Sequence, residues 1–227
     1  MDNAARGRGG LPATARAGAF TLIELLVVIA VIATLVGILV PAVSNAIDIA
    51  ADSRTRARIQ ALGQGAHQFK ADFGYFPGQN PRDDNSLLDN GRGSALLGKF
   101  LFENEDGDFP IEKYVGYEEG LVATSDNYGP QSYDEYTLLD GTKNQMAICY
   151  YPSRPGRTGL NQYDEDDNSQ YTQGNTGGPF DEFIRDPRFD DDDTVDSSDQ
   201  PRKSEEFLLI APGRDQEYFT SDDITNW

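Results

Sequence analysis

The longest apolar run lies near the N-terminus, where residues 25–47 contain no charged side chain. In a helix these 23 residues would extend about 35 Å at ~1.5 Å per residue. That length exceeds the ~30 Å hydrocarbon core of a bilayer, so the run predicts a membrane-spanning helix. One acidic residue, Glu24, directly precedes the run.

After this run the pattern becomes that of an amphipathic helix. An apolar stripe with one polar member steps by three or four residues through Ile47, Ala51, Thr55, Ile59, Leu62, Ala66, Phe69 and Phe73. The charged residues Asp48, Asp52, Arg54, Arg58 and Lys70 fall mostly off the stripe. Gly74 and Pro77 supply the stop signals. The pattern therefore predicts one helix over residues 20–73, which Pro41 should kink or loosen by removing a hydrogen bond.

The residues after this helix predict a small, loop-rich domain with an antiparallel sheet, and hence an α+β fold. Residues 146–151 and Phe207–Ala211 are short apolar runs bounded by turn residues, which is typical of strands. Residues 136–139 are expected to pair with the first of these strands. The stretch 152–205 holds 14 acidic and six basic residues with little apolar periodicity, and it predicts a long surface excursion.

Charge and residue usage narrow the functional classes. The chain has 38 acidic and 19 basic residues, a net charge of −19, which excludes nucleic-acid binding through phosphates and favours divalent cations or a strongly solvated surface. The single cysteine, Cys149, excludes an internal disulfide. The only histidine, His67, lies on the long helix beside its apolar stripe, a poor position for a catalytic pocket. Since no phosphate loop or zinc spacing occurs either, the sequence does not predict an enzyme.

The N-terminal segment differs from a secretory signal peptide, because its small residues precede the apolar run instead of following it. The string Gly-Ala-Phe-Thr-Leu-Ile-Glu at 18–24 resembles the processing site of type IV prepilins and type II secretion pseudopilins. The resemblance implies that a prepilin peptidase cuts before Phe20 and methylates its new amine. Glu24 then becomes the fifth residue of the mature chain, and Pro41 falls where these proteins carry a proline. Ala19 stands where the family usually has glycine, with Gly18 one position earlier.

Physical chemistry also indicates that the carboxylate of Glu24 needs a positively charged partner. An ionised side chain at the centre of a membrane helix costs roughly 2.5–3.5 kcal/mol on insertion scales, and somewhat less near an end. Cleavage before Phe20 would create an α-amine of pKa about 7.7–8.0 one helical turn away. In a helical stack, the amine of one subunit can meet Glu24 of its neighbour. The alternative is an acid at the interfacial end of an ordinary membrane anchor.

The C-terminus contains a second resemblance. Residues 207–215 and 220–227 resemble the terminal strand and calcium loop of major pseudopilins. This resemblance implies a structural Ca²⁺, with Asp215 and Asp222 as ligands, Asp223 as a third carboxylate and Ser221 as a further oxygen donor; a cation of this kind prefers six to eight hard oxygens. The loop departs from the family in Arg214, in the Gln-Glu pair at 216–217, and in Phe219, which replaces a common glycine. The alternative is a solvated acidic tail.

The resulting division of the chain has four parts: a basic leader at 1–19, a transmembrane and assembly helix at 20–43, its amphipathic continuation at 44–73, and an exported acidic domain at 74–227. Removing the leader, which carries three arginines and one aspartate, takes the net charge from −19 to −21.

The resemblance implies a single-pass protein of the bacterial inner membrane, with its C-terminal domain in the periplasm or on the cell surface. Its expected role is that of a structural subunit of a type II secretion pseudopilus. The expected partners are further copies of the chain, prepilin peptidase, other pseudopilins and the inner-membrane secretion platform. Two alternatives stay open: a type IV pilin for adhesion, motility or DNA uptake, and a monomeric anchor that presents an acidic calcium- or ligand-binding domain.

Overall fold

A computed structural model describes residues 20–80, 85–124, 131, 133–189, 194–196 and 199–227. The chain divides into two compact units, Met1–Asn45 and Ala46–Trp227. Gly18 and Ala19 of the expected processing site lie outside the described residues.

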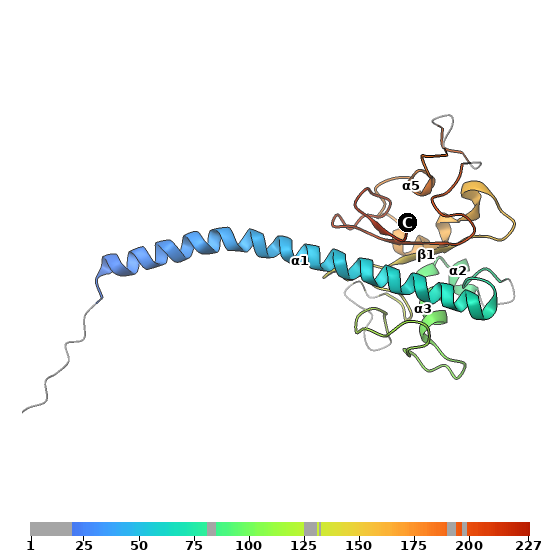
Figure 1. Ribbon diagram of the computed structural model, residues 1–227, viewed down its shortest axis with the longest axis horizontal. Helices are drawn as coiled ribbons and strands as arrows, with labels where there is room; N and C mark the ends of the chain where they lie inside the picture. Colours follow the sequence, from blue (N-terminus) through green and yellow to red (C-terminus); the bar gives the residue numbers. More distant parts are fainter. Residues whose placement is uncertain (1–19, 81–84, 125–130, 132, 190–193, 197–198) are drawn as a thin grey trace, which may run out of the picture. The chain divides into compact units, whose positions relative to one another are not determined.

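The elements follow one another in a helix-rich order with a late sheet (Figure 1). They are α1 (Leu22–Phe73), α2 (Ser86–Asp89), α3 (Gly93–Phe102), β1 (Cys149–Pro152), η1 (Gly159–Gln162), η2 (Glu165–Asn168), α4 (Ser169–Thr172), α5 (Phe180–Ile184), β2 (Phe207–Ala211) and β3 (Ile224–Thr225). A long N-terminal helix with a small three-stranded antiparallel sheet is the α+β, pilin-like architecture that the sequence predicts.

Helix α1 confirms the predicted long helix to within two residues at its start. It continues through Pro41, so the lost hydrogen bond does not interrupt it. It ends where Gly74 takes a φ of 85° and donates its N–H to the Lys70 carbonyl at 2.7 Å, which is the expected glycine stop. The helix contains a segment that is long and apolar enough to cross a membrane.

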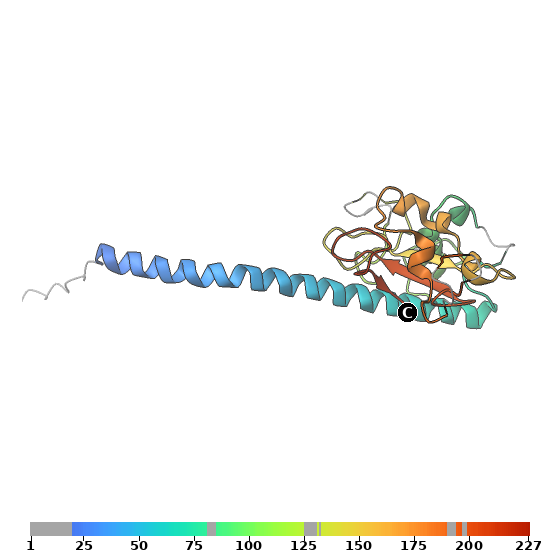
Figure 2. The same cartoon turned by 90° about the horizontal axis from the view of Figure 1, so that it is seen from above.

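The second unit is built on a sheet that is buried on both faces. Its strand order is β1-β2-β3, with Tyr150 opposite Leu209 and Ala211 opposite Ile224. One face packs with the second half of α1 and with α3, and Figure 2 shows α1 running along this side of the sheet. The other face packs against aromatic and aliphatic residues of η1, α4 and α5. Residues 138–139 lie next to 147–148 through a single bridge, so the expected pairing forms without a regular strand.

Two expectations from the sequence are wrong. The stretch 152–205 is not a surface excursion, because its scattered apolar residues build the second core: Leu160, Tyr163, Tyr171, Phe180 and Ile184 are buried. Arg58, expected on the polar side of α1, is only 5% exposed. The stripe itself is buried from Thr55 to Phe69, whereas Ile47 and Phe73 at its ends are exposed.

Candidate functional site

The first candidate site is the N-terminal turn of α1. The Thr21 backbone N–H and hydroxyl donate to Glu24 Oε2 at 2.8 and 2.7 Å, and the Glu24 N–H donates to the Thr21 hydroxyl at 3.3 Å. This reciprocal pattern is a capping box, which satisfies amides that have no partner within the helix. The signal for this cap in the sequence is the Thr-x-x-Glu spacing of Thr21 and Glu24. Glu24 thus has a local partner, while its Oε1 has no hydrogen-bond partner among the described residues.

The residues that follow present an uncovered apolar surface. Phe20 is 83% exposed, and the large apolar residues of the first unit are all exposed from Leu22 to Val43. A soluble protein seldom leaves an apolar surface of this extent in water. This surface therefore requires lipid or other copies of the helix to cover it.

The second candidate site is the loop that joins β2 to β3. The pairing of Ala211 with Ile224 fixes its two ends. Between them, one carboxylate oxygen from each of Asp215, Asp222 and Asp223 lies within 4.8 Å of the other two. No other group of three potential metal ligands occurs in the part of the chain that the structure describes.

Hydrogen bonds arrange these carboxylates. Asp222 Oδ2 accepts the Arg214 and Asp215 N–H groups at 2.8 and 3.4 Å, and the Thr220 hydroxyl donates to Asp222 Oδ1 at 2.7 Å. Asp223 Oδ2 accepts the Phe219 N–H at 2.8 Å. A loop that folds back onto its own carboxylates in this way holds several oxygens at one point.

The backbone shows what conformation the loop takes where its sequence departs from the calcium loops that it resembles. Gln216 and Phe219 have φ values of 64° and 65°, so they adopt the left-handed conformation that glycine takes without strain. Phe219 is held there by packing, since its ring is buried against Phe180 at a centroid distance of 5.2 Å. A glycine is still required at 213, because a Cβ there would lie 2.3 Å from the Asp222 carboxyl carbon.

The electrostatics of the loop leave negative charge to be balanced. Burial raises the pKa of Asp223 to about 6, against the opposing effect of its hydrogen bonds. Burial also acts to raise the pKa of Asp222, but hydrogen bonds from Thr220, Arg214 and Asp215 outweigh it, and the pKa is lowered. The guanidinium of Arg214, a residue of the same loop, pairs with Asp52 of α1 at 2.8 Å.

The donor set fits a hard divalent cation. All three convergent groups are carboxylates, and no histidine or cysteine accompanies them in the described loop. Calcium prefers such oxygen ligands and completes its shell with carbonyls and water. Ser221 lies in the same loop and is exposed, and its hydroxyl has no hydrogen-bond partner among the described residues. The structure therefore brings together the carboxylates of Asp215, Asp222 and Asp223, and the role of these residues and of Ser221 as ligands stays a prediction.

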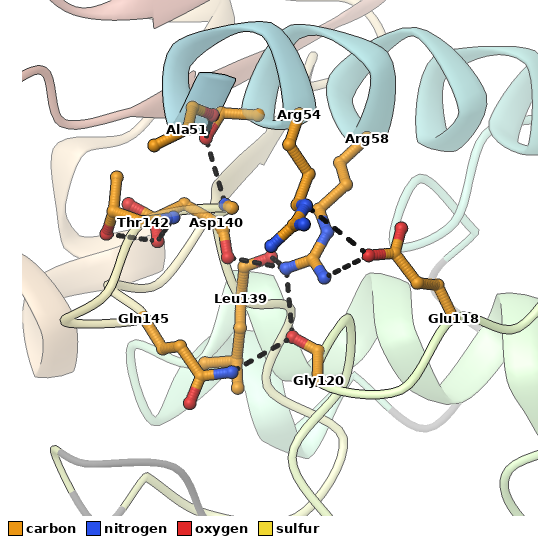
Figure 3. Close-up of polar contacts among 11 residues, drawn as sticks. Ala51, Arg54, Arg58, Glu118, Gly120, Leu139, Asp140, Thr142 and Gln145 are labelled. Carbon is orange, nitrogen blue, oxygen red and sulfur yellow. Dashed lines mark hydrogen bonds and ion pairs between the residues drawn. The ribbon is translucent and has the colours of Figure 1, made fainter. Parts of the chain in front are cut away.

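A buried polar cluster behind this loop was not predicted from the sequence (Figure 3). Arg58 Nη1 donates to the carbonyls of Gly120 and Leu139, each at 2.9 Å, and to that of Asp140 at 2.5 Å. Its Nη2 pairs with Glu118 at 2.9 Å. Nη1 carries two hydrogens, so the three carbonyls share them, while the buried Nε has no hydrogen-bond partner among the described residues. Arg58 thereby ties α1 to two separate loops of the domain.

Asp140 forms the other half of this cluster. Its Oδ1 accepts hydrogen bonds from the Thr142 N–H and hydroxyl and from the Met146 N–H, at 2.7–3.1 Å. Burial raises the pKa of Asp140, although these bonds and Arg58 oppose the shift. Its carbonyl binds Arg58 while its carboxylate shapes the turn at 140–146, so one residue connects this turn to α1.

The side chains considered for catalysis have other surroundings. His67 is exposed on α1, beside the rings of Phe76 and Phe207 at 5.3 and 5.4 Å. Cys149 is fully buried in β1, where burial raises the pKa of its thiol. It therefore packs as a small hydrophobic residue.

Comparison with known proteins gives one match. Residues 14–40 match the prokaryotic N-terminal methylation motif. No curated protein and no solved structure matches the chain. The motif covers the expected cleavage position, Glu24 and most of the apolar run. It supports a pilin-like protein that is processed by a prepilin peptidase, anchored by an N-terminal helix and assembled into a filament.

Proposed function

We propose that the chain is a structural subunit of a type II secretion pseudopilus. The observation that carries this proposal is the methylation motif at 14–40, which contains an acid at the fifth position after the expected cut before Phe20. The exposed apolar surface of α1 supports it, because helix bundling in a filament would cover that surface.

In the proposed mechanism, cleavage frees the amine of Phe20 and leaves the apolar helix as the N-terminus of the mature chain. The helices then leave the bilayer and bundle into the filament core, and the acidic domains remain outside. Glu24 of each subunit meets the methylated amine of a neighbour, which compensates both charges in an apolar environment. An ATPase-driven platform adds subunits, and the growing filament pushes substrate through an outer-membrane channel.

We further propose that Ca²⁺ is a structural ligand of the loop between β2 and β3. Asp215, Asp222 and Asp223 would hold it, with Ser221 as an additional oxygen donor. When bound, the ion supplies positive charge to a chain of net charge −19 and fixes the loop that ends the sheet. Its role is to stabilise the domain, and no reaction is assigned to it.

The first test is the intact mass and N-terminal peptide of the membrane-extracted chain, co-expressed with a prepilin peptidase. The proposal expects a chain that begins at N-methylated Phe20. Co-expression with a catalytically inactive peptidase is the control and should leave the leader attached. A chain that begins at residue 1 or 2 with the active enzyme would contradict filament assembly and favour the monomeric anchor.

A second test separates the pseudopilus from a type IV pilus. A bacterial strain that lacks this chain should lose export of its type II secretion substrates while it keeps adhesion, motility and DNA uptake. The opposite pattern would assign the chain to a type IV pilus. Complementation with the Glu24→Ala variant should fail in either case, because both filaments depend on the same N-terminal helix.

A further inference from the structure

Three elements of the second unit meet beside the acidic loop. They are the part of α1 from Ile47 to Arg58, the turn at 140–146, and the loop at 212–223. The first two turns of this part of α1 line a cavity of about 270 Å³ together with the turn and the loop. Each pair of elements is joined by polar contacts. The three contacts form a closed ring, called here the loop–helix ring.

The first side of the ring joins the loop to α1. Arg214 donates from Nη2 and Nε to Asp52 Oδ2 at 2.8 and 3.1 Å. The backbone N–H of the same residue donates to Asp222 Oδ2. Arg214 therefore binds a proposed metal ligand through its backbone and α1 through its side chain.

The other two sides pass through the turn at 140–146. Asn144 Nδ2 donates to Gln216 Oε1 at 2.6 Å, which joins the turn to the loop. The Gly141 N–H donates to the Thr55 hydroxyl at 2.9 Å, and Arg58 binds the Asp140 carbonyl, which joins the turn to α1. Gly141 approaches so closely that a Cβ there would lie 2.7 Å from Arg54. The turn consequently has little freedom to move away from the helix.

We propose that cation binding in the loop is coupled to the seating of α1 against the domain, with Arg214 as the positioning residue. This inference rests on the calcium site of the proposed function. A cation held by Asp215 and Asp222 would fix the backbone at 214–215, because the N–H groups of these two residues bind Asp222. Fixing this backbone would also hold the Arg214 side chain in place on Asp52. The Arg214 side chain is about half exposed, and an exposed ion pair alone contributes little. The coupling is therefore carried by the closed ring instead of by the pair alone.

The coupling must be reciprocal, because two sites linked by one free energy affect each other equally. Changing Asp52, which holds no ion, should therefore weaken calcium binding in the loop. Arg214→Gln gives the sharper test. It removes a positive charge next to the carboxylates, so Coulomb's law alone expects tighter calcium binding. The loop–helix ring expects weaker binding.

The experiment measures calcium affinity by titration calorimetry on the full chain in detergent micelles. We expect Arg214→Gln and Asp52→Asn each to weaken binding by about fivefold, the lower end of measured couplings. The double variant should bind no more weakly than either single variant. Asp48→Asn, which removes an equal charge one turn away without touching the ion pair, is the matched control and should bind close to wild type. Unchanged or tighter binding by Arg214→Gln would overturn the coupling.

Hydrogen–deuterium exchange of the same full-length proteins distinguishes this inference from the proposed site. In the wild type, calcium should slow exchange in peptides from both 213–223 and 46–58. In Asp52→Asn it should slow only the loop. A wild type protected in the loop but unchanged at 46–58 would overturn the coupling alone. A wild type without calcium protection in either segment would overturn both the site and the coupling.

Discussion

At the scale of single residues, Glu24 has two roles, a cap of its own helix and a proposed contact with a neighbouring subunit, and mutations can separate them. Its Oε2 closes the capping box with Thr21, and its remaining oxygen is the proposed partner of a neighbour's amine. Thr21→Ala should cost about 1 kcal/mol of local helix stability, as for a lost cap, and still permit filament assembly. Glu24→Ala removes both contacts and should abolish assembly.

Quantifying sheared filaments by sedimentation compares these variants directly. Glu24→Gln adds a third case, because it keeps hydrogen bonding but removes the charge, and it should also fail. If Thr21→Ala failed as completely as Glu24→Ala, the acid would act through the cap and the proposed intersubunit pair would be wrong.

Asp167 is the residue whose titration should be visible in stability. Burial raises its pKa to about 7, although the Arg154 guanidinium, 2.5 Å from Asp167 Oδ1, opposes the shift. The folded-state pKa lies above the unfolded value, so the folded state binds this proton more tightly. The protonated carboxyl of Asp167 therefore contributes to the free energy of unfolding in full below about pH 4, and this contribution is lost as the pH rises from 4 through 7.

Asp167→Asn should therefore match the wild type near pH 4 and exceed it increasingly as the pH rises to 7, by about 4 kcal/mol at pH 8. Thermal melts of both proteins across this range measure the difference. Asp106→Asn, at an exposed position, is the control and should give a constant offset. A wild type that gained stability relative to Asp167→Asn with rising pH would show that the ion pair with Arg154 dominates instead.

At the scale of elements, the packing of α1 against the loops of the second unit depends more on Arg58 than on the exposed Arg56. Arg58→Ala leaves three carbonyls and Glu118 without their guanidinium partner in a site that is largely buried. Loss of one partner from a buried polar cluster costs about 3–5 kcal/mol. Arg56→Ala, two residues away on an exposed position, should change stability by less than about 0.5 kcal/mol. Urea unfolding of the full chain in micelles gives both values.

The contrast between these arginines shows where sequence patterns stop being informative. The apolar periodicity predicts α1 because burial of one helix face repeats every three or four residues. The same rule assigns Arg58 to solvent, because Arg58 is charged and lies off the apolar stripe. The rule misses its burial because the three carbonyls that accept its hydrogen bonds belong to the backbone at 120, 139 and 140, which no side-chain pattern encodes. Phe207–Ala211 is predicted correctly because all five of its residues are buried in consecutive positions.

The stretch 152–205 was predicted wrongly for a related reason. It contributes isolated buried residues such as Tyr163 and Phe180 from turns and short helices, so their spacing carries no period. Conversely, the carboxylates of Asp215, Asp222 and Asp223 lie close together, and their role as calcium ligands stays a prediction. That expectation came from resemblance to a calcium loop. Composition alone would not have separated these acids from the many others.

At the scale of the whole molecule, the proposed calcium site makes the ion a condition of stability for so acidic a chain. After removal of the leader the net charge becomes −21, and copies packed in a filament would bring these charges together. An ion that binds only the folded loop stabilises the domain by about 2.7 kcal/mol at a hundredfold excess over its dissociation constant. Chelation with EGTA should therefore lower the melting temperature of the full chain and promote disassembly of sheared filaments.

The Asp222→Asn variant tests whether the loop is the origin of this effect. It should begin with the lower melting temperature of the chelated wild type and show no further response to EGTA or to added calcium. Asp106→Asn removes one charge from a different acidic turn and should keep the full wild-type response, which controls for net charge. If both variants still responded to calcium like the wild type, the ion would act by diffuse screening of the acidic surface. In that case the loop between β2 and β3 would have no specific site.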